Sequence, residues 1–171
     1  MKDFLNRYIP RKDRPALLFL ILAGTLSHFL YELTGSPFIA LFCPVNESVW
    51  EHLKLLFFPY LAYSLWHFVR IRRKPYPPAY FYFRLMGVLC GMLAIVMLFY
   101  TYTGISGRTV LALDILIFII GAFLSLQTVS FFTKRASSIP SSTITYLMWL
   151  GITLCFFMFT CFPPDIPLFL E

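Results

Sequence analysis

Five long runs of mostly apolar residues limit what this chain can fold into. They cover residues 16–34, 49–69, 80–102, 109–132 and 142–162. A helix needs about 20 such residues to cross the hydrocarbon core of a bilayer, and each run is bounded by charge, proline or glycine. We therefore predict an all-α fold, a polytopic transmembrane helical bundle of about five spans that forms a single domain over residues 1–171.

The composition indicates that a lipid bilayer is the main surrounding of the chain. Hydrophobic residues make up 59% of the 171 residues and charged residues 13%, whereas an ordinary soluble domain has about 25% charged residues. The net charge is +6, but the basic residues stand in short clusters between apolar runs. Nucleic-acid binding would need a basic patch on a polar domain, so we expect the lipid bilayer as partner and no nucleic acid.

The positions of Lys and Arg predict the orientation of the bundle. All but two of the 14 Lys and Arg residues lie before the first run, around the connection between the second and third, or after the fourth. The exceptions are Lys54 and Arg108. An excess of Lys and Arg marks the cytoplasmic side of a membrane protein. We predict a multi-pass protein of the cell membrane with its N-terminus inside and its C-terminus outside.

Under this orientation His67 lies near the cytoplasmic end, and the other acidic and imidazole side chains in or beside the runs gather in the outer half of the bundle. They are His28, Glu32, Glu47, Glu51, His52 and Asp114. Ionisable groups within a membrane are costly and are usually functional. His28 and Glu32 are four residues apart, as are Glu47 and Glu51, so each pair would share one helix face. Two acids on one face repel each other unless a cation, a proton or a lysine offsets them.

This gathering predicts a polar site that could bind a divalent metal ion. Imidazole and carboxylate groups are suitable metal ligands, and the interpretation assigns that role to His28, Glu32, Glu51 and Asp114. It assigns acid–base or ligand roles in catalysis to Glu47, Glu51 and His52.

Structural roles explain the same residues without a site. Asn46 is a good helix N-cap, and Glu47 after it would suit the positive end of a helix dipole. His28 and Glu32 could simply form a buried hydrogen-bonded pair that joins helices, and Asp114 could pair with Arg108. Trp50 is typical of an interfacial anchor. Whether Cys43 and Cys161, expected on one side of the membrane, form a disulfide is left open by their spacing.

Two stretches of the chain resemble a known family. Residues 44–55 read PVNESVWEHLKL, and residues 24–32 read GTLSHFLYE. They look like the polar signature and the first-span motif of a family of small bacterial integral membrane proteins, a domain of unknown function with a PVNESxWEHxKL motif. The resemblance implies a multi-span fold with a characteristic polar motif, and it implies no reaction.

Three functions remain open at this level. The first is a metal-dependent membrane enzyme that acts on a lipid-type substrate from the outer leaflet. The second is an ion- or proton-coupled transporter, in which the acids would be the coupling sites. The third is a non-catalytic assembly subunit, in which the polar cluster only holds helices together. The sequence alone does not decide among these functions, and it does not give the oligomeric state.

Overall fold

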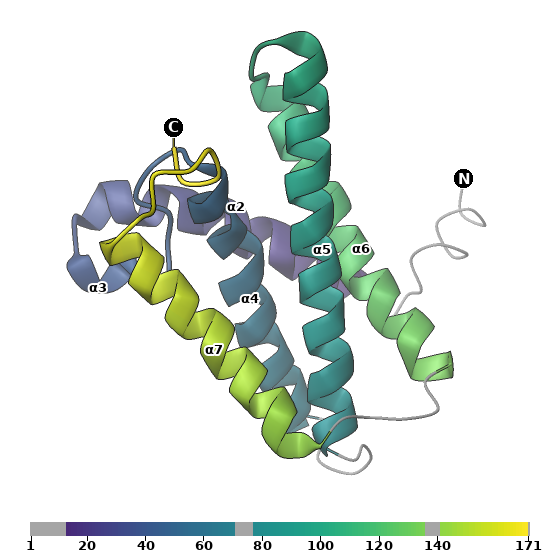
Figure 1. Cartoon of the computed structure of the whole chain (residues 1–171). Coiled ribbons are helices and arrows are strands. Elements are labelled where there is room, and N and C mark those ends of the chain that lie inside the picture. The colour runs from purple at the N-terminus through teal and green to yellow at the C-terminus, as the bar shows by residue number, and fades with distance from the viewer. Residues whose placement is uncertain (1–12, 71–76, 136–140, 171) are drawn as a thin grey trace.

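The computed structural model describes residues 13–70, 77–135 and 141–170, and the described chain consists of six helices with no strand. The helices are α2 (Arg14–Thr34), α3 (Pro37–Ala40), α4 (Val49–Arg70), α5 (Pro77–Ser106), α6 (Leu111–Arg135) and α7 (Ser142–Cys161). Figure 1 shows α4, α5, α6 and α7 running along the bundle and α2 passing behind α5 and α6. The basic arm before Asp13 and the basic connection at 71–76, on which the predicted orientation depends, lie outside the described residues.

Four of the helices are long and apolar enough to cross a membrane, namely α2, α5, α6 and α7. The fifth predicted span, 49–69, does form a helix of suitable length, but α4 is not among the four. It carries Glu51, His52 and Lys54 near its start, and 11 of its 22 residues are buried. It contacts α2, α5, α6 and α7, and its buried residues lie between Val49 and Ser64. A helix that its neighbours shield from lipid does not need an apolar surface of its own.

Helices α5 and α6 form the closest pair because small residues face each other along their contact. A Cβ atom on Gly91 would lie 2.6 Å from the carbonyl oxygen of Gly121, and one on Gly87 would lie 2.5 Å from that of Ser125. Glycines four residues apart let two helix backbones approach closely within a membrane. The two helices run side by side and their connecting turn extends beyond the other helices (Figure 1).

Aromatic side chains pack α4 against α7. The ring of Phe57 lies 5.0 Å from that of Phe156 and 5.5 Å from that of Trp149, measured between centroids. The indole nitrogen of Trp149 donates a hydrogen bond to the carbonyl of Phe81 on α5. Large apolar side chains elsewhere are exposed, including Leu33 and Leu111 at 81% and 75%. Such a surface fits a protein embedded in lipid.

The chain after α7 folds back over the start of α4 (Figure 1). The backbone N–H of Trp50 donates to the carbonyl of Leu168. The ring of Phe169 is buried and lies 5.0 Å from that of Trp50 and 5.2 Å from that of Phe159. Trp50, for which the sequence predicts an interfacial anchor, holds the C-terminal segment 163–170 on the bundle through these contacts.

Candidate functional site

A glycine in α2 brings the first histidine of the site into place. A Cβ atom on Gly24 would lie 2.8 Å from the carbonyl oxygen of Leu55 and 2.5 Å from Cζ of Phe118, so α2 and α4 approach closely there. His28 follows one turn later on the same face of α2. Its Nε2 atom lies 3.2 Å from Nε2 of His52 on α4.

The start of α4 determines where Glu47 lies. The hydroxyl of Ser48 accepts a hydrogen bond from the backbone N–H of Glu51, which is the N-cap interaction of a helix beginning at Val49. The cap predicted at Asn46 is therefore corrected to Ser48, while the side chain of Asn46 accepts from the N–H of Ser48. Ser48-x-x-Glu51 is the spacing of a capping box, so this signal was present in the sequence. Glu47 consequently lies in the loop before the helix.

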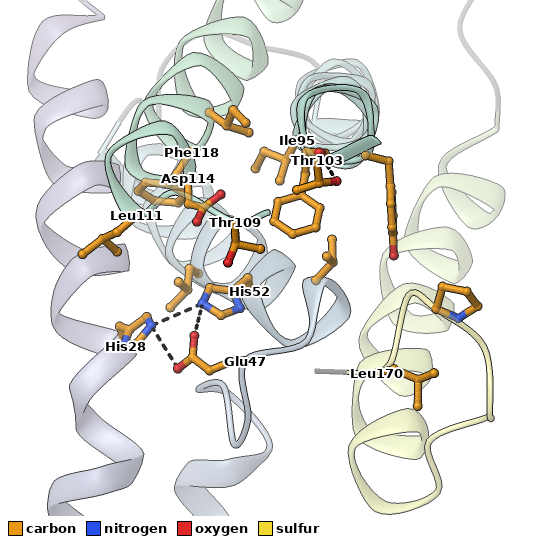
Figure 2. A pocket seen from close by; sticks show the side chains of 16 residues that line it. His28, Glu47, His52, Ile95, Thr103, Thr109, Leu111, Asp114, Phe118 and Leu170 are labelled. Carbon is orange, nitrogen blue, oxygen red and sulfur yellow. Dashed lines mark hydrogen bonds and ion pairs between the residues drawn. The ribbon is translucent and has the colours of Figure 1, made fainter. Parts of the chain in front are cut away.

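Glu47 completes a group of three side chains (Figure 2). One carboxylate oxygen lies 3.4 Å from Nε2 of His52, and the other lies 3.8 Å from Nε2 of His28. The ligand atoms of the three residues all lie within 4.8 Å of one another. Two ligands at tetrahedral positions with metal bonds of about 2.0–2.1 Å are about 3.3 Å apart. The group therefore has the spacing that could hold a metal ion.

The hydrogen bonds of the two imidazoles prepare His52 as a ligand more than His28. Nδ1 of His52 lies 2.9 Å from the carbonyl oxygen of Ser48, to which only a protonated nitrogen can donate. That bond leaves Nε2 of neutral His52 with a free lone pair, directed at the other two members of the group. A carbonyl in this position fixes the tautomer and orientation of a metal-binding histidine. In His28, Nδ1 is buried without a hydrogen-bond partner in the described structure.

The group opens into a pocket of about 620 Å³. The side chain of Glu47 is 67% exposed, and those of His28 and His52 are 28% and 30% exposed. Most of the remaining wall is apolar and comes from α4, α5, α6 and the C-terminal segment; it includes Leu55, Ile95, Phe99, Leu111, Ile117, Phe118, Pro167 and Leu170. A metal held by three protein ligands would keep a further coordination position for a substrate or water.

Asp114 lines the same pocket from α6 and does not belong to the three-residue group (Figure 2). The hydroxyl of Tyr102 on α5 donates a hydrogen bond to Oδ1 of Asp114. The backbone N–H of Val110 donates to that hydroxyl in turn, over 3.2 Å. Asp114 is therefore oriented by Tyr102, and not by Arg108, which was the partner in the structural alternative.

Glu51 is engaged in a buried ion pair. Its Oε2 atom lies 2.6 Å from Nζ of Lys54, and both side chains are at most 4% exposed. The N–H of Val45 donates to Oε2, and the hydroxyl of Thr160 on α7 donates to Oε1. Lys54 donates to the carbonyls that precede this loop, those of Ala40 and Cys43. Glu51 thus joins α4, α7 and the loop, and it does not reach the three-residue group.

Two further expectations are placed by the structure. Glu32 is exposed on α2 and lies outside the three-residue group. The carboxylate that faces His28 is that of Glu47. All four cysteines are free, so the disulfide that the sequence left open between Cys43 and Cys161 is not formed. Burial raises the pKa of the Cys43 thiol above its ordinary value, against smaller opposing effects of Ser27 and Lys54.

Comparison with known proteins identifies the family. A family model described as "Family of unknown function (DUF6512)" matches residues 12–171, which is nearly the whole chain. The chain therefore belongs to this family. Neither a search of curated proteins nor a search of solved structures found a match. The expectation that the chain belongs to a family of unknown function is confirmed. The family description names no reaction.

Proposed function

We propose that this DUF6512 protein is a metal-dependent membrane enzyme that acts on a lipid-type substrate. His28, Glu47 and His52 would hold one divalent ion, such as Zn²⁺. The observation that carries the proposal is the mutual spacing of the three ligand atoms at the mouth of an apolar-walled pocket. A metal with an open coordination position can polarise a carbonyl group or lower the pKa of bound water, and either effect supports hydrolysis of an ester or amide.

The walls of the pocket support a lipid as the substrate. Apolar side chains from α4, α5 and α6 extend from the histidines toward the middle of the helices, and they include Leu55, Ile95 and Ile117. Pockets that bind small molecules are mostly apolar, with few polar groups that fix orientation. An acyl chain could therefore lie along the helices while the head group faces the three ligands.

The proposal includes the finer topology of five spans with the N-terminus in the cytoplasm. The length of α4 and its enclosure by other helices support its role as the central, fifth span. The distribution of Lys and Arg supports the orientation, because Lys54 and Arg108 are the exceptions among 14. The pocket would then open toward the outer leaflet. Labelling a cysteine added at either terminus of the chain in sealed vesicles tests this, and external labelling of the N-terminus would contradict it.

Metal content tests the site directly. The protein is purified in mild detergent, stripped with a chelator, reloaded with Zn²⁺ and analysed by mass spectrometry for bound metal. We expect close to one ion per chain, lost in His52→Ala and strongly weakened in Glu47→Gln. The matched control is Glu32→Gln, which removes an exposed carboxylate outside the group. Equal metal content in all variants, or none in the wild type, would refute the site.

Turnover separates the enzyme from the two other functions. Wild-type protein, with and without Zn²⁺, is placed in liposomes of mixed bacterial lipids, and the lipids are followed by mass spectrometry. We expect one lipid class to decline with a matching gain of its hydrolysis products only when Zn²⁺ is present. Metal binding without turnover would favour a non-catalytic subunit. Ion flux that Glu47→Gln abolishes, again without turnover, would favour a transporter.

A further inference from the structure

The charges that line the pocket restrict its occupant beyond its being a lipid. Among the residues that the structure describes, 16 line the pocket, and they include two carboxylates, Glu47 and Asp114, but no Lys or Arg. A phosphate or carboxylate head group is usually held by arginine, lysine or backbone N–H groups. The pocket offers such a head group no permanent positive side chain. Its electrostatic surroundings suit a head group that carries hydrogen-bond donors or a positive charge.

Asp114 is the acceptor best placed to recognise such a group. It lies on α6, apart from the three-residue group on α2, the loop and α4, so a metal ion there would leave it free for substrate. The bond from Tyr102 fixes Oδ1, and a carboxylate can accept several more hydrogen bonds. Ile117 and Phe118 follow it on α6 and provide apolar wall beside it. An alkyl chain with an ammonium at one end could therefore pack against these apolar side chains and pair its charge with Asp114.

We propose that the pocket recognises a single-chain lipid whose head group bears an ammonium, with Asp114 as the residue that binds it. This inference rests on the proposed function, whose substrate class it names. Tyr102 is the positioning residue that orients the carboxylate through its hydroxyl. Under this assignment the three-residue group faces the bond to be cleaved, and Asp114 selects the substrate by its charge.

The test compares three head groups on one chain length in metal-free protein. The protein is stripped with a chelator, so that a carboxylate probe cannot bind through a metal. Binding of radiolabelled dodecylamine to detergent-solubilised protein is measured by scintillation proximity and competed with unlabelled dodecylamine, dodecanol or dodecanoate. One charge-assisted hydrogen bond predicts that the amine competes at least about tenfold more tightly than the alcohol. The carboxylate should be the weakest competitor.

Variants assign the preference to Asp114. Asp114→Asn should bring the amine and the alcohol to nearly equal competition, whereas Asp114→Glu should retain much of the preference because it keeps the charge. Tyr102→Phe should reduce the preference by less than Asp114→Asn. The control Glu32→Gln removes a negative charge outside the pocket and should leave the preference unchanged. If Asp114→Asn does not fold, competition on the wild type still tests the preference for the amine, and competition on Tyr102→Phe still tests whether Asp114 causes it.

Each outcome bears on one proposal only. Equal competition by amine and alcohol in the wild type, or an amine preference that survives in Asp114→Asn, would overturn the inference. A preference that disappears in Glu47→Gln but not in Asp114→Asn would also overturn it, because the three-residue group would then bind the amine. Metal binding is measured in separate samples. Failure of the metal site would therefore leave the amine preference standing, and the reverse also holds.

Discussion

Two carboxylates four residues apart, Glu47 and Glu51, have opposite surroundings. The side chain of Glu51 is 4% exposed, and its two oxygens face Lys54, a backbone N–H and a threonine hydroxyl. The side chain of Glu47 is 67% exposed and faces two imidazoles at the mouth of a pocket. The first arrangement is closed and satisfied, and the second is open with acceptor capacity to spare.

Under the proposed function, the difference divides one polar motif into a structural part and a metal-binding part. A buried charge is tolerated when its hydrogen bonds are complete, and Glu51 with Lys54 meets that condition. Such a pair fixes the loop that carries Glu47. His28, Glu47 and His52 form the open group. This group depends on the fixed loop to place Glu47, but it makes few of the contacts that hold the loop. Substitutions should therefore separate the two parts, with stability following Glu51 and Lys54 and ligand binding following His28, Glu47 and His52.

The largest effect is expected from breaking the closed pair, which is the buried ion pair of Glu51 and Lys54. Lys54→Met leaves the Glu51 carboxylate buried without its cation, which typically costs about 3–5 kcal/mol. The free energy of unfolding, measured by titration with sodium dodecyl sulfate in mixed micelles, should fall by that amount. The double variant Glu51→Gln/Lys54→Met removes both charges and should recover a large part of the loss. A Lys54→Met protein as stable as the wild type would contradict a structural role for the pair.

Removing a member of the open group should have the reverse pattern. His52→Ala deletes one of the three proposed metal ligands, and we expect the affinity for Zn²⁺ to fall by more than about a hundredfold, since even outer-sphere partners of a ligand are worth about 10–100-fold. The unfolding free energy should change by about 1 kcal/mol or less, because the side chain is partly exposed and makes one hydrogen bond to backbone. Competition against a chromophoric chelator gives the affinity. A stability loss as large as that of Lys54→Met would join the two parts into one.

An intermediate effect is expected at Ser48, which serves both parts. Its hydroxyl caps α4 through the N–H of Glu51, and its carbonyl accepts from His52. Ser48→Ala removes only the cap, so stability should fall by about 1 kcal/mol while the Zn²⁺ affinity stays within about threefold. Ser141→Ala is the matched control, because Ser141 caps α7 away from the pocket. A large loss of Zn²⁺ affinity in Ser48→Ala would mean that the cap positions His52.

The sequence predicted the helices well because apolar length is a strong constraint. Predicted and observed bounds of the five long helices differ by a few residues, as for 16–34 and Arg14–Thr34. The short helix α3 was not predicted, because its four residues follow the glycine and proline that bound the first apolar run. Gly35 does end α2, with a φ of 56°, but Pro37 then begins a new helix. Proline at the first helical position is favourable, so the signal was ambiguous.

The site was predicted in its residue types but not in its grouping. His28, Glu47 and His52 all stood out as polar groups at one level. Glu47 and Glu51 were assigned to one helix face, which required a helix that includes both. Because Ser48 caps α4, Glu47 lies before the helix and turns toward α2 instead. The spacing of three residues between Glu51 and Lys54 did allow their ion pair on one helix. Which carboxylate meets the two histidines depends on how the loop folds, and spacing alone does not contain that information.

The smallest effect on stability concerns the thiol of Cys43, which reports on the closed pair. The carbonyl of Cys43 accepts from Lys54, and its side chain is buried. Burial raises the pKa of this thiol, and each unit of increase lowers the thiolate fraction about tenfold below that pKa. Because the folded chain holds the proton longer, a rise in pH past the ordinary thiol pKa should slightly lower stability. The reactive species is the thiolate, so alkylation at neutral pH should be slow.

A chain with Cys43 as its single cysteine, made by replacing Cys90, Cys155 and Cys161 with alanine, allows the measurement. Mass spectrometry follows the reaction of Cys43 with N-ethylmaleimide in this single-cysteine parent and in the parent with Lys54→Met or His52→Ala added. Lys54→Met releases the loop and should speed the reaction by about tenfold or more, because exposure restores the ordinary pKa. His52→Ala should leave the rate near that of the parent. Equal acceleration in both variants would mean that the open group also holds the loop, and the division between the two carboxylates would then fail.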